Sequence, residues 1–142
     1  MNLVDQLLEK PCYIIDFLPQ KVNENCNGQF FEVENYLLNH YDRFGIRDRI
    51  ICILLKMMCY YPVSVLWSEW IENPKPEQVV YIIDTIMKKQ SGELNVIFTN
   101  KNALLQFDWD CLNISIYNPN GEMKILFEKI ASSEGMFWRK AE

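Results

Sequence analysis

The sequence predicts a single α+β domain spanning residues 1–142, and three observations support this prediction. The chain has 142 residues, which is the usual size of one domain. Apolar residues at helical spacing dominate the part before about residue 91. Alternating apolar and polar residues at 94–117 and 136–140 predict a mainly antiparallel sheet on which the helices pack, with a strand–helix–strand unit at the C-terminal end.

The first 41 residues predict a short helix, a strand and a longer helix. Residues 2–10 precede a proline and predict the short helix, and residues 12–19, CYIIDFLP, predict a buried strand. Residues 29–41 have apolar residues at helical spacing, although Phe31 and Val33 alternate with glutamates as they would in a strand. We predict a helix for this segment.

Residues 46–61 are apolar almost all round, which predicts a central helix packed on several sides. Asp42 is the residue that we expect to cap it. The apolar run continues beyond this helix, but Lys56 in its middle and Pro62 after it argue against a membrane-spanning helix. We therefore predict a buried helix followed by a strand at 62–67.

The next segment, residues 73–92, predicts a complete helix. It has prolines near its start, an apolar face, two lysines in its last turn and Gly92 as the stop. The segments that follow have strand character, with one last helical pattern among them. The predicted strands are 94–99, 103–107, 112–117 and 136–140, of which the first three form a meander, and the last helix covers 123–131.

The strand pattern changes parity in the segment FDWDC, residues 107–111. Apolar residues fall at odd positions before residue 112 and at even positions from there on, which requires a bulge or a turn. We expect Asp108 and Asp110 to bond local backbone groups at this strand end. The alternative is that the two carboxylates, with Asn113, bind a divalent cation, but such sites usually have more oxygen ligands, and we predict no metal.

Three stretches resemble small uncharacterised cytosolic proteins of Gram-positive bacteria. They are YIIDFLP at 13–19, DCLNISIYNPNGEM at 110–123 and SSEGMFW at 132–138. In those proteins an aspartate–cysteine start, a Tyr-Asn-Pro turn and a Glu-Gly-x-Phe end recur. The resemblance implies a single α+β domain and no known activity, so no catalytic residue is carried over.

Charge and cysteine content argue against several functional classes. The net charge is −5 and both halves of the chain are acidic, so the basic surface that nucleic-acid binding requires is missing. The five cysteines contain no C-x-x-C pair and the first residues lack the layout of a secretory signal, which predicts reduced thiols in the cytoplasm. The common nucleotide, zinc-protease and hydrolase motifs are absent, and we expect no cofactor.

Few residues offer catalytic chemistry. His40 is the only histidine, and Cys26 is the cysteine that it could activate, but we favour a capping histidine and an inert thiol. Cys52 and Cys59 lie on one face of the predicted central helix, and we expect both in the core.

Arg43 and Arg47 lie four residues apart and could together bind a phosphate or a carboxylate. Asp42 and Asp48 accompany them and largely cancel the local charge. We therefore favour a solvated, salt-bridged helix end over an anion site.

The segment YYPVSVLWSEW, residues 60–70, is rich in aromatic residues and has two interpretations. Most of its rings are expected in the core, but they could also form a partner-binding patch, whose members would be Tyr60, Tyr61, Trp67 and Trp70. Acidity, aromatic content and the poor catalytic inventory together predict a non-enzymatic interaction protein, such as an inhibitor or immunity-type partner of a basic protein. The alternative is a small enzyme or ligand-binding protein whose pocket uses Asp108, Asp110, Arg43 or Arg47.

Overall fold

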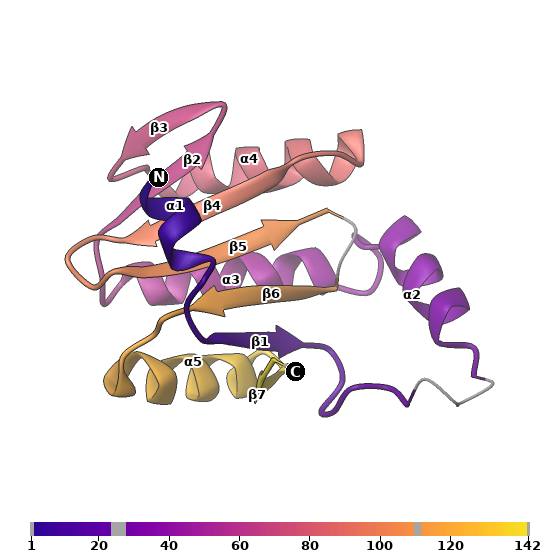
Figure 1. Ribbon diagram of the computed structural model, residues 1–142. Helices are drawn as coiled ribbons and strands as arrows, with labels where there is room; N and C mark the ends of the chain where they lie inside the picture. The colour runs from indigo at the N-terminus through magenta and orange to yellow at the C-terminus, as the bar shows by residue number, and fades with distance from the viewer. Residues whose placement is uncertain (1, 24–27, 110–111, 142) are drawn as a thin grey trace.

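The computed structural model describes residues 2–23, 28–109 and 112–141, which form both helices and strands (Figure 1). The strands are β1 (Cys12–Asp16), β2 (Val63–Trp67), β3 (Glu69–Glu72), β4 (Glu93–Phe98), β5 (Ala103–Asp108), β6 (Asn113–Tyr117) and β7 (Phe137–Lys140). The helices are α1 (Leu3–Leu7), α2 (Phe30–Asn39), α3 (Ile46–Met58), α4 (Pro76–Lys89) and α5 (Gly121–Ser133). The predicted α+β class is confirmed.

All seven described strands join one antiparallel sheet in the order β3-β2-β4-β5-β6-β1-β7. The predicted meander is confirmed, because β4, β5 and β6 are successive neighbours. Strand β3 was not predicted from the sequence. Strand β1 comes first in the sequence, but it lies between β6 and β7, the last two strands of the chain that are described. Strands β4, β5 and β6 therefore pair with neighbours in the sequence, whereas β1 pairs with strands that are distant from it in the sequence.

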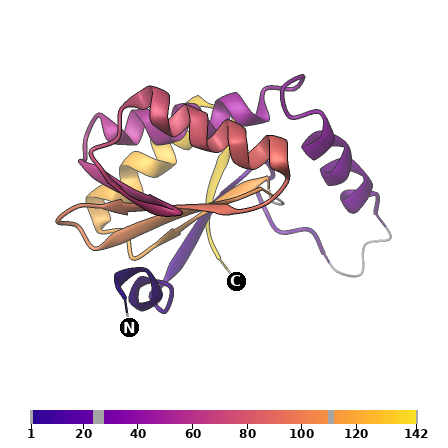
Figure 2. The same ribbon diagram turned by 90° about the horizontal axis from the view of Figure 1, so that it is seen from above.

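Helices lie on both faces of the sheet, in unequal number (Figure 2). Helices α3, α4 and α5 cover one face, which we call the helix face, and the short α1 lies on the opposite face, the α1 face. Helix α2 lies beside the end of the sheet and covers neither face. In the described part of the chain, no helix is long and apolar enough to cross a membrane.

The main core lies between the sheet and the three helices of the helix face. Alternate strand residues point into it, as Ala103, Leu105 and Phe107 of β5 do, while Leu104, which lies between the first two, packs under α1. Helix α3 contributes Ile53 and Leu54, which are both almost completely buried. Lys56 of the same helix points away from the core and donates a hydrogen bond to Ser133 at the end of α5. The central buried helix predicted from the apolar run is thus confirmed.

Two predicted helix boundaries are wrong. Gly45, not Asp42, precedes the first turn of α3, because the chain enters that helix with a left-handed residue (φ +75°) that glycine adopts without strain. Helix α4 ends at Gln90, which takes the left-handed conformation (φ +53°) two residues before Gly92. The predicted basic last turn of α4 is confirmed, because Lys88 and Lys89 occupy it.

Candidate functional site

A cleft of about 410 Å³ opens where β1 ends and β6 begins, and this volume is within the usual range for ligand pockets. We call it the β1–α2 cleft. Its base is formed by Asp16, Asn113 and Arg139 from three adjacent strands. One wall comes from the segment after β1, including Leu18 and Val22, and the other comes from Phe30, Phe31 and Glu34 of α2.

A buried ion pair lies at the base of this cleft. Nη2 of Arg139 donates to Oδ2 of Asp16 at 3.1 Å, and the two side chains are 17% and 10% exposed. The second carboxylate oxygen, Oδ1, accepts from the backbone N–H of Phe17 at 2.8 Å. Nε of Arg139 is also buried, and none of the described residues accepts its hydrogen. The carboxylate is therefore satisfied on both oxygens, while the guanidinium has an unused donor.

The strand register explains why these two charges meet. Ile14 lies opposite Arg139 in the β1–β7 pair, and Asp16 is two residues from Ile14, so both charged side chains emerge on the α1 face. Neither residue was singled out from the sequence. A signal was present, because Asp16 ends an otherwise apolar strand, and a buried carboxylate needs a partner.

Helix α2 exposes several of its apolar side chains, although Leu37 and Leu38 are half-buried against the main core. None of its residues is buried, and Phe31, Val33 and Tyr36 are 77%, 48% and 47% exposed. Phe44 follows in the next turn, is 43% exposed, and its ring lies 5.8 Å from the ring of Tyr36. We call these four residues the α2 surface. The predicted helix at 29–41 is confirmed, but its outward apolar side was not predicted.

His40 lies at the end of α2, as expected, and stabilises it locally. Its Nδ1 donates to the backbone carbonyl of Tyr36 at 2.8 Å, and its ring stacks on the Tyr36 ring at 4.2 Å. Cys26, the cysteine considered as its catalytic partner, lies outside the described residues. The described contacts of His40 are therefore those of a residue at a helix end.

The four aromatic residues predicted as a binding patch do not share one surface. Tyr61 is 6% exposed and packs edge-on against Phe98 in the core, whereas Tyr60 beside it is 62% exposed. Trp67 is half-buried among the residues of the helix face. Trp70 lies opposite Leu66, on the α1 face, and is 49% exposed. Tyr60 and Tyr61 lie between α3 and β2, while Trp67 and Trp70 belong to the β2–β3 hairpin and lie on opposite faces of it, because side chains alternate along a strand.

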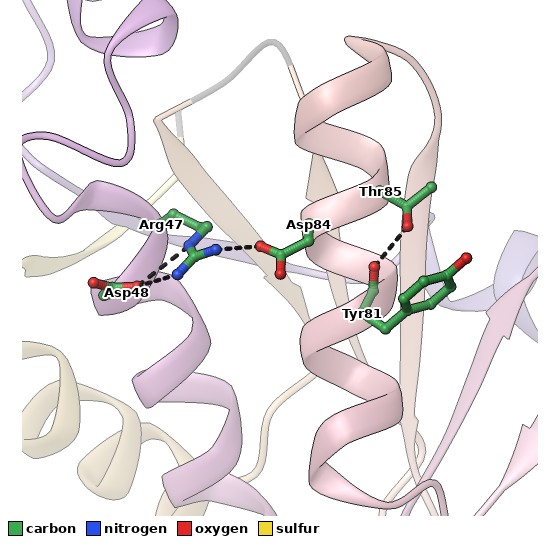
Figure 3. Close-up of polar contacts among 5 residues, drawn as sticks. All are labelled: Arg47, Asp48, Tyr81, Asp84 and Thr85. Atoms are coloured by element: carbon green, nitrogen blue, oxygen red, sulfur yellow. Dashed lines mark hydrogen bonds and ion pairs between the residues drawn. The ribbon is translucent and has the colours of Figure 1, made fainter.

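Arg47 is held by two carboxylates, one from its own helix and one from α4 (Figure 3). It donates to Asp48 at 2.8 Å and also to Asp84, and the hydrogen bond to Asp48 raises the pKa of Arg47. Arg43 instead lies over the ring of Phe44, 5.9 Å from its centroid. The two arginines thus have different partners, and Arg47 belongs to a salt-bridged helix end, as favoured from the sequence.

Asp108 is the last residue of β5 and lies opposite Glu93. The predicted strand end at the parity change is confirmed, because Phe107 and Leu112 on either side of it are both buried. Asp110 lies outside the described residues. Among the residues that are described, no three histidine, cysteine or acidic side chains gather as metal ligands would.

If Asp108 serves only the strand end, replacing it with asparagine should lower the free energy of unfolding by less than about 1 kcal/mol, because an acceptor of the same shape remains. Millimolar Mg²⁺ or Ca²⁺ should leave the melting temperature of the wild type unchanged. Thermal unfolding with and without the ions measures both effects. A melting temperature that rises with the ion in the wild type, but not in the Asp108→Asn/Asp110→Asn variant, would instead show a cation site.

The described cysteines are free thiols, but one of the two that we expected in the core is exposed. Cys12, Cys52 and Cys59 form no disulfide. Cys52 is half-buried, but Cys59, which follows the last residue of α3, is exposed, so the prediction that Cys59 lies in the core is wrong.

We expect iodoacetamide to alkylate Cys59 faster than Cys12 in the folded protein. Burial raises the pKa of the Cys12 thiol, partly offset by hydrogen bonds with Tyr117 and Ser115, so less of the reactive thiolate is present at pH 8. The rate at Cys12 should rise as the pH increases towards the raised pKa. Mass spectrometry of peptides after timed alkylation gives both rates, and the urea-unfolded chain is the control. Equal rates in the folded protein would contradict this prediction.

Comparison of the chain with protein-family models, curated proteins and solved structures finds no match in any of the three. The resemblance to small proteins of Gram-positive bacteria therefore stays a prediction.

Proposed function

We propose that this chain is a non-enzymatic protein-interaction module and that it binds its partner through the α2 surface. The observation that carries the proposal is a ten-residue helix without a buried residue, on which Phe31, Val33 and Tyr36 are exposed. Exposed apolar groups on a small protein are typical of interaction sites, and the rings of Tyr36 and Phe44 adjoin one another here, 5.8 Å apart. Burying one such ring against a partner contributes about 1.5–3 kcal/mol.

Charge favours a basic partner. Helix α2 carries Glu32 and Glu34 and no lysine or arginine, Arg43 beside Phe44 adds one positive charge, and the whole chain has a net charge of −5. Two copies of this helix facing each other would bring like charges together, which disfavours self-association through it. A partner with basic groups around an apolar centre complements both properties of the surface. An inhibitor or immunity-type role, in the cytoplasm of a bacterium, is the role that we propose for such an interaction.

The test is affinity capture from the native cell with quantitative mass spectrometry. The wild type, the Phe31→Ser/Tyr36→Ser variant and the control Ile125→Ser serve as baits, because Ile125 on α5 is 58% exposed and distant in sequence from α2. We expect one basic protein to be captured in stoichiometric amount by the wild type and the control. The double variant should capture at most about one tenth as much of this protein, since two aromatic anchors are lost.

Added salt should weaken the capture, because exposed charges are screened at high ionic strength. Melting curves must show that the baits are equally folded, which we expect since α2 buries none of its side chains completely. Equal capture by all three baits, or an acidic partner, would refute the proposed function.

A further inference from the structure

We propose that the β1–α2 cleft receives one internal apolar residue of the partner chain, whose backbone carbonyl accepts a hydrogen bond from Arg139. The inference rests on the proposed function, because it names what the partner inserts beside the α2 surface. Phe31 connects the two sites, since it belongs to the α2 surface and also lines the cleft. A chain that contacts Phe31 therefore has the cleft directly beside it.

The walls of the cleft fit an apolar side chain. Leu18 and Val22 form one side, and Phe30 and Phe31 form the other. A volume of about 410 Å³ has room for one large side chain and the peptide groups next to it. Aromatic and aliphatic anchors in such pockets supply most of the affinity in protein interfaces.

The base of the cleft requires an acceptor. Arginine has five N–H donors, and the described residues give Arg139 one side-chain acceptor, the carboxylate of Asp16. Its buried Nε has no acceptor among those residues. A buried donor without a partner is unfavourable, so a ligand that supplies an oxygen here gains a hydrogen bond that the free protein lacks.

The charges around the cleft indicate a neutral oxygen. Among the described residues that line the cleft, Lys21 and Arg139 are balanced by Asp16 and Glu34, so these residues carry no formal net charge. A carboxylate would add a negative charge beside Asp16, and an ammonium would add a positive charge beside Arg139, each in a partly desolvated place. An amide carbonyl satisfies the donor without adding charge. The group that fits is thus an internal peptide unit, and not a chain terminus or a charged metabolite.

The experiment is an NMR titration of the ¹⁵N-labelled full chain at pH 6 with N-acetyl-L-phenylalaninamide, a neutral apolar residue with a peptide group on each side. The Nε–Hε signal of Arg139 can be observed directly, as can the backbone amides of Phe17 and Asn113. We expect these signals to shift and to saturate at roughly millimolar concentration, the affinity of a ligand of this size. N-acetylglycinamide, which lacks the side chain, and N-acetyl-L-phenylalanine, which adds a carboxylate, should shift them several-fold less.

Two variants locate the binding. Leu18→Ser removes one apolar wall and should abolish the response, whereas Ile125→Ser on α5 should retain it. No shift of the Arg139 signal in the wild type, or an unchanged response in Leu18→Ser, would overturn the inference. That result would leave the proposed function intact if the α2 variant still loses its partner. Conversely, the cleft signals could shift while the Phe31→Ser/Tyr36→Ser variant captures the partner as well as the wild type does. That result would refute the proposed function, but the cleft would remain a binding pocket.

Discussion

Replacing Ile53 or Leu54 with alanine should lower the free energy of unfolding by about 2 to 5 kcal/mol, the usual effect of truncating a fully buried aliphatic side chain. The two residues are 0% and 2% exposed in the middle of α3, between the sheet and the other helices of the helix face. Each substitution removes apolar contacts and leaves a cavity that the surrounding residues fill only in part. Equilibrium unfolding in urea, followed by circular dichroism, measures the change.

The matched control is Ile125→Ala, because Ile125 also lies on a helix but is 58% exposed. Its effect should stay within about 0.5 kcal/mol. A loss below about 1 kcal/mol in both α3 variants would mean that α3 is not packed as the central helix.

The Arg139→Met substitution should destabilise the protein by about 3 to 5 kcal/mol, because it leaves a buried carboxylate without its cation. Asp16 is 7% exposed, and after the substitution its side chain would keep the hydrogen bond from the N–H of Phe17 alone. The control is Arg47→Met, which removes the ion pairs with Asp48 and Asp84 of an arginine side chain that is 30% exposed. We expect that control to cost about 1 kcal/mol or less.

Urea unfolding of the two single variants and of Asp16→Leu/Arg139→Met measures these effects. In the double variant both charges are absent, so much of the lost stability should return. Similar effects for Arg139→Met and Arg47→Met would show that the Asp16–Arg139 pair is as solvated as a surface pair.

Local patterns predicted most of the helices and the meander. The helix at 73–92 and the strands at 94–107 depend on neighbours close in the sequence, so spacing and turn residues were sufficient to find them. Strand β3, with the sequence EWIE, was missed, because it lies at the edge of the sheet and has no run of apolar residues. The pattern of α2 predicted a helix with an apolar face, and Leu37 and Tyr41 of that face are half-buried against the main core, but the pattern did not indicate that Phe31 and Tyr36 would be exposed on the same helix.

The candidate site was less accessible to sequence reasoning than the fold. Asp16 and Arg139 are 123 residues apart in the chain, and only the pairing of β1 with β7 brings them together. The residues of the predicted aromatic patch show the opposite case, because they are close in the sequence but do not share one surface. Tyr61 and Trp70 are close in the sequence, but one enters the core and the other lies on the α1 face.

The position of β1 between β6 and β7 has a consequence for the order of events during folding. Residues 12–16 are synthesised before their hydrogen-bonding partners at 113–117 and 137–140, which follow about 100 and about 125 residues later. The β2–β6 part of the sheet has largely local connections, so it can assemble while β1 is still unpaired. Until β6 and β7 are available, the apolar CYII segment is an unpaired strand with which other nascent chains could pair. We expect the insertion of β1 between β6 and β7 to be the slow, aggregation-sensitive step of folding.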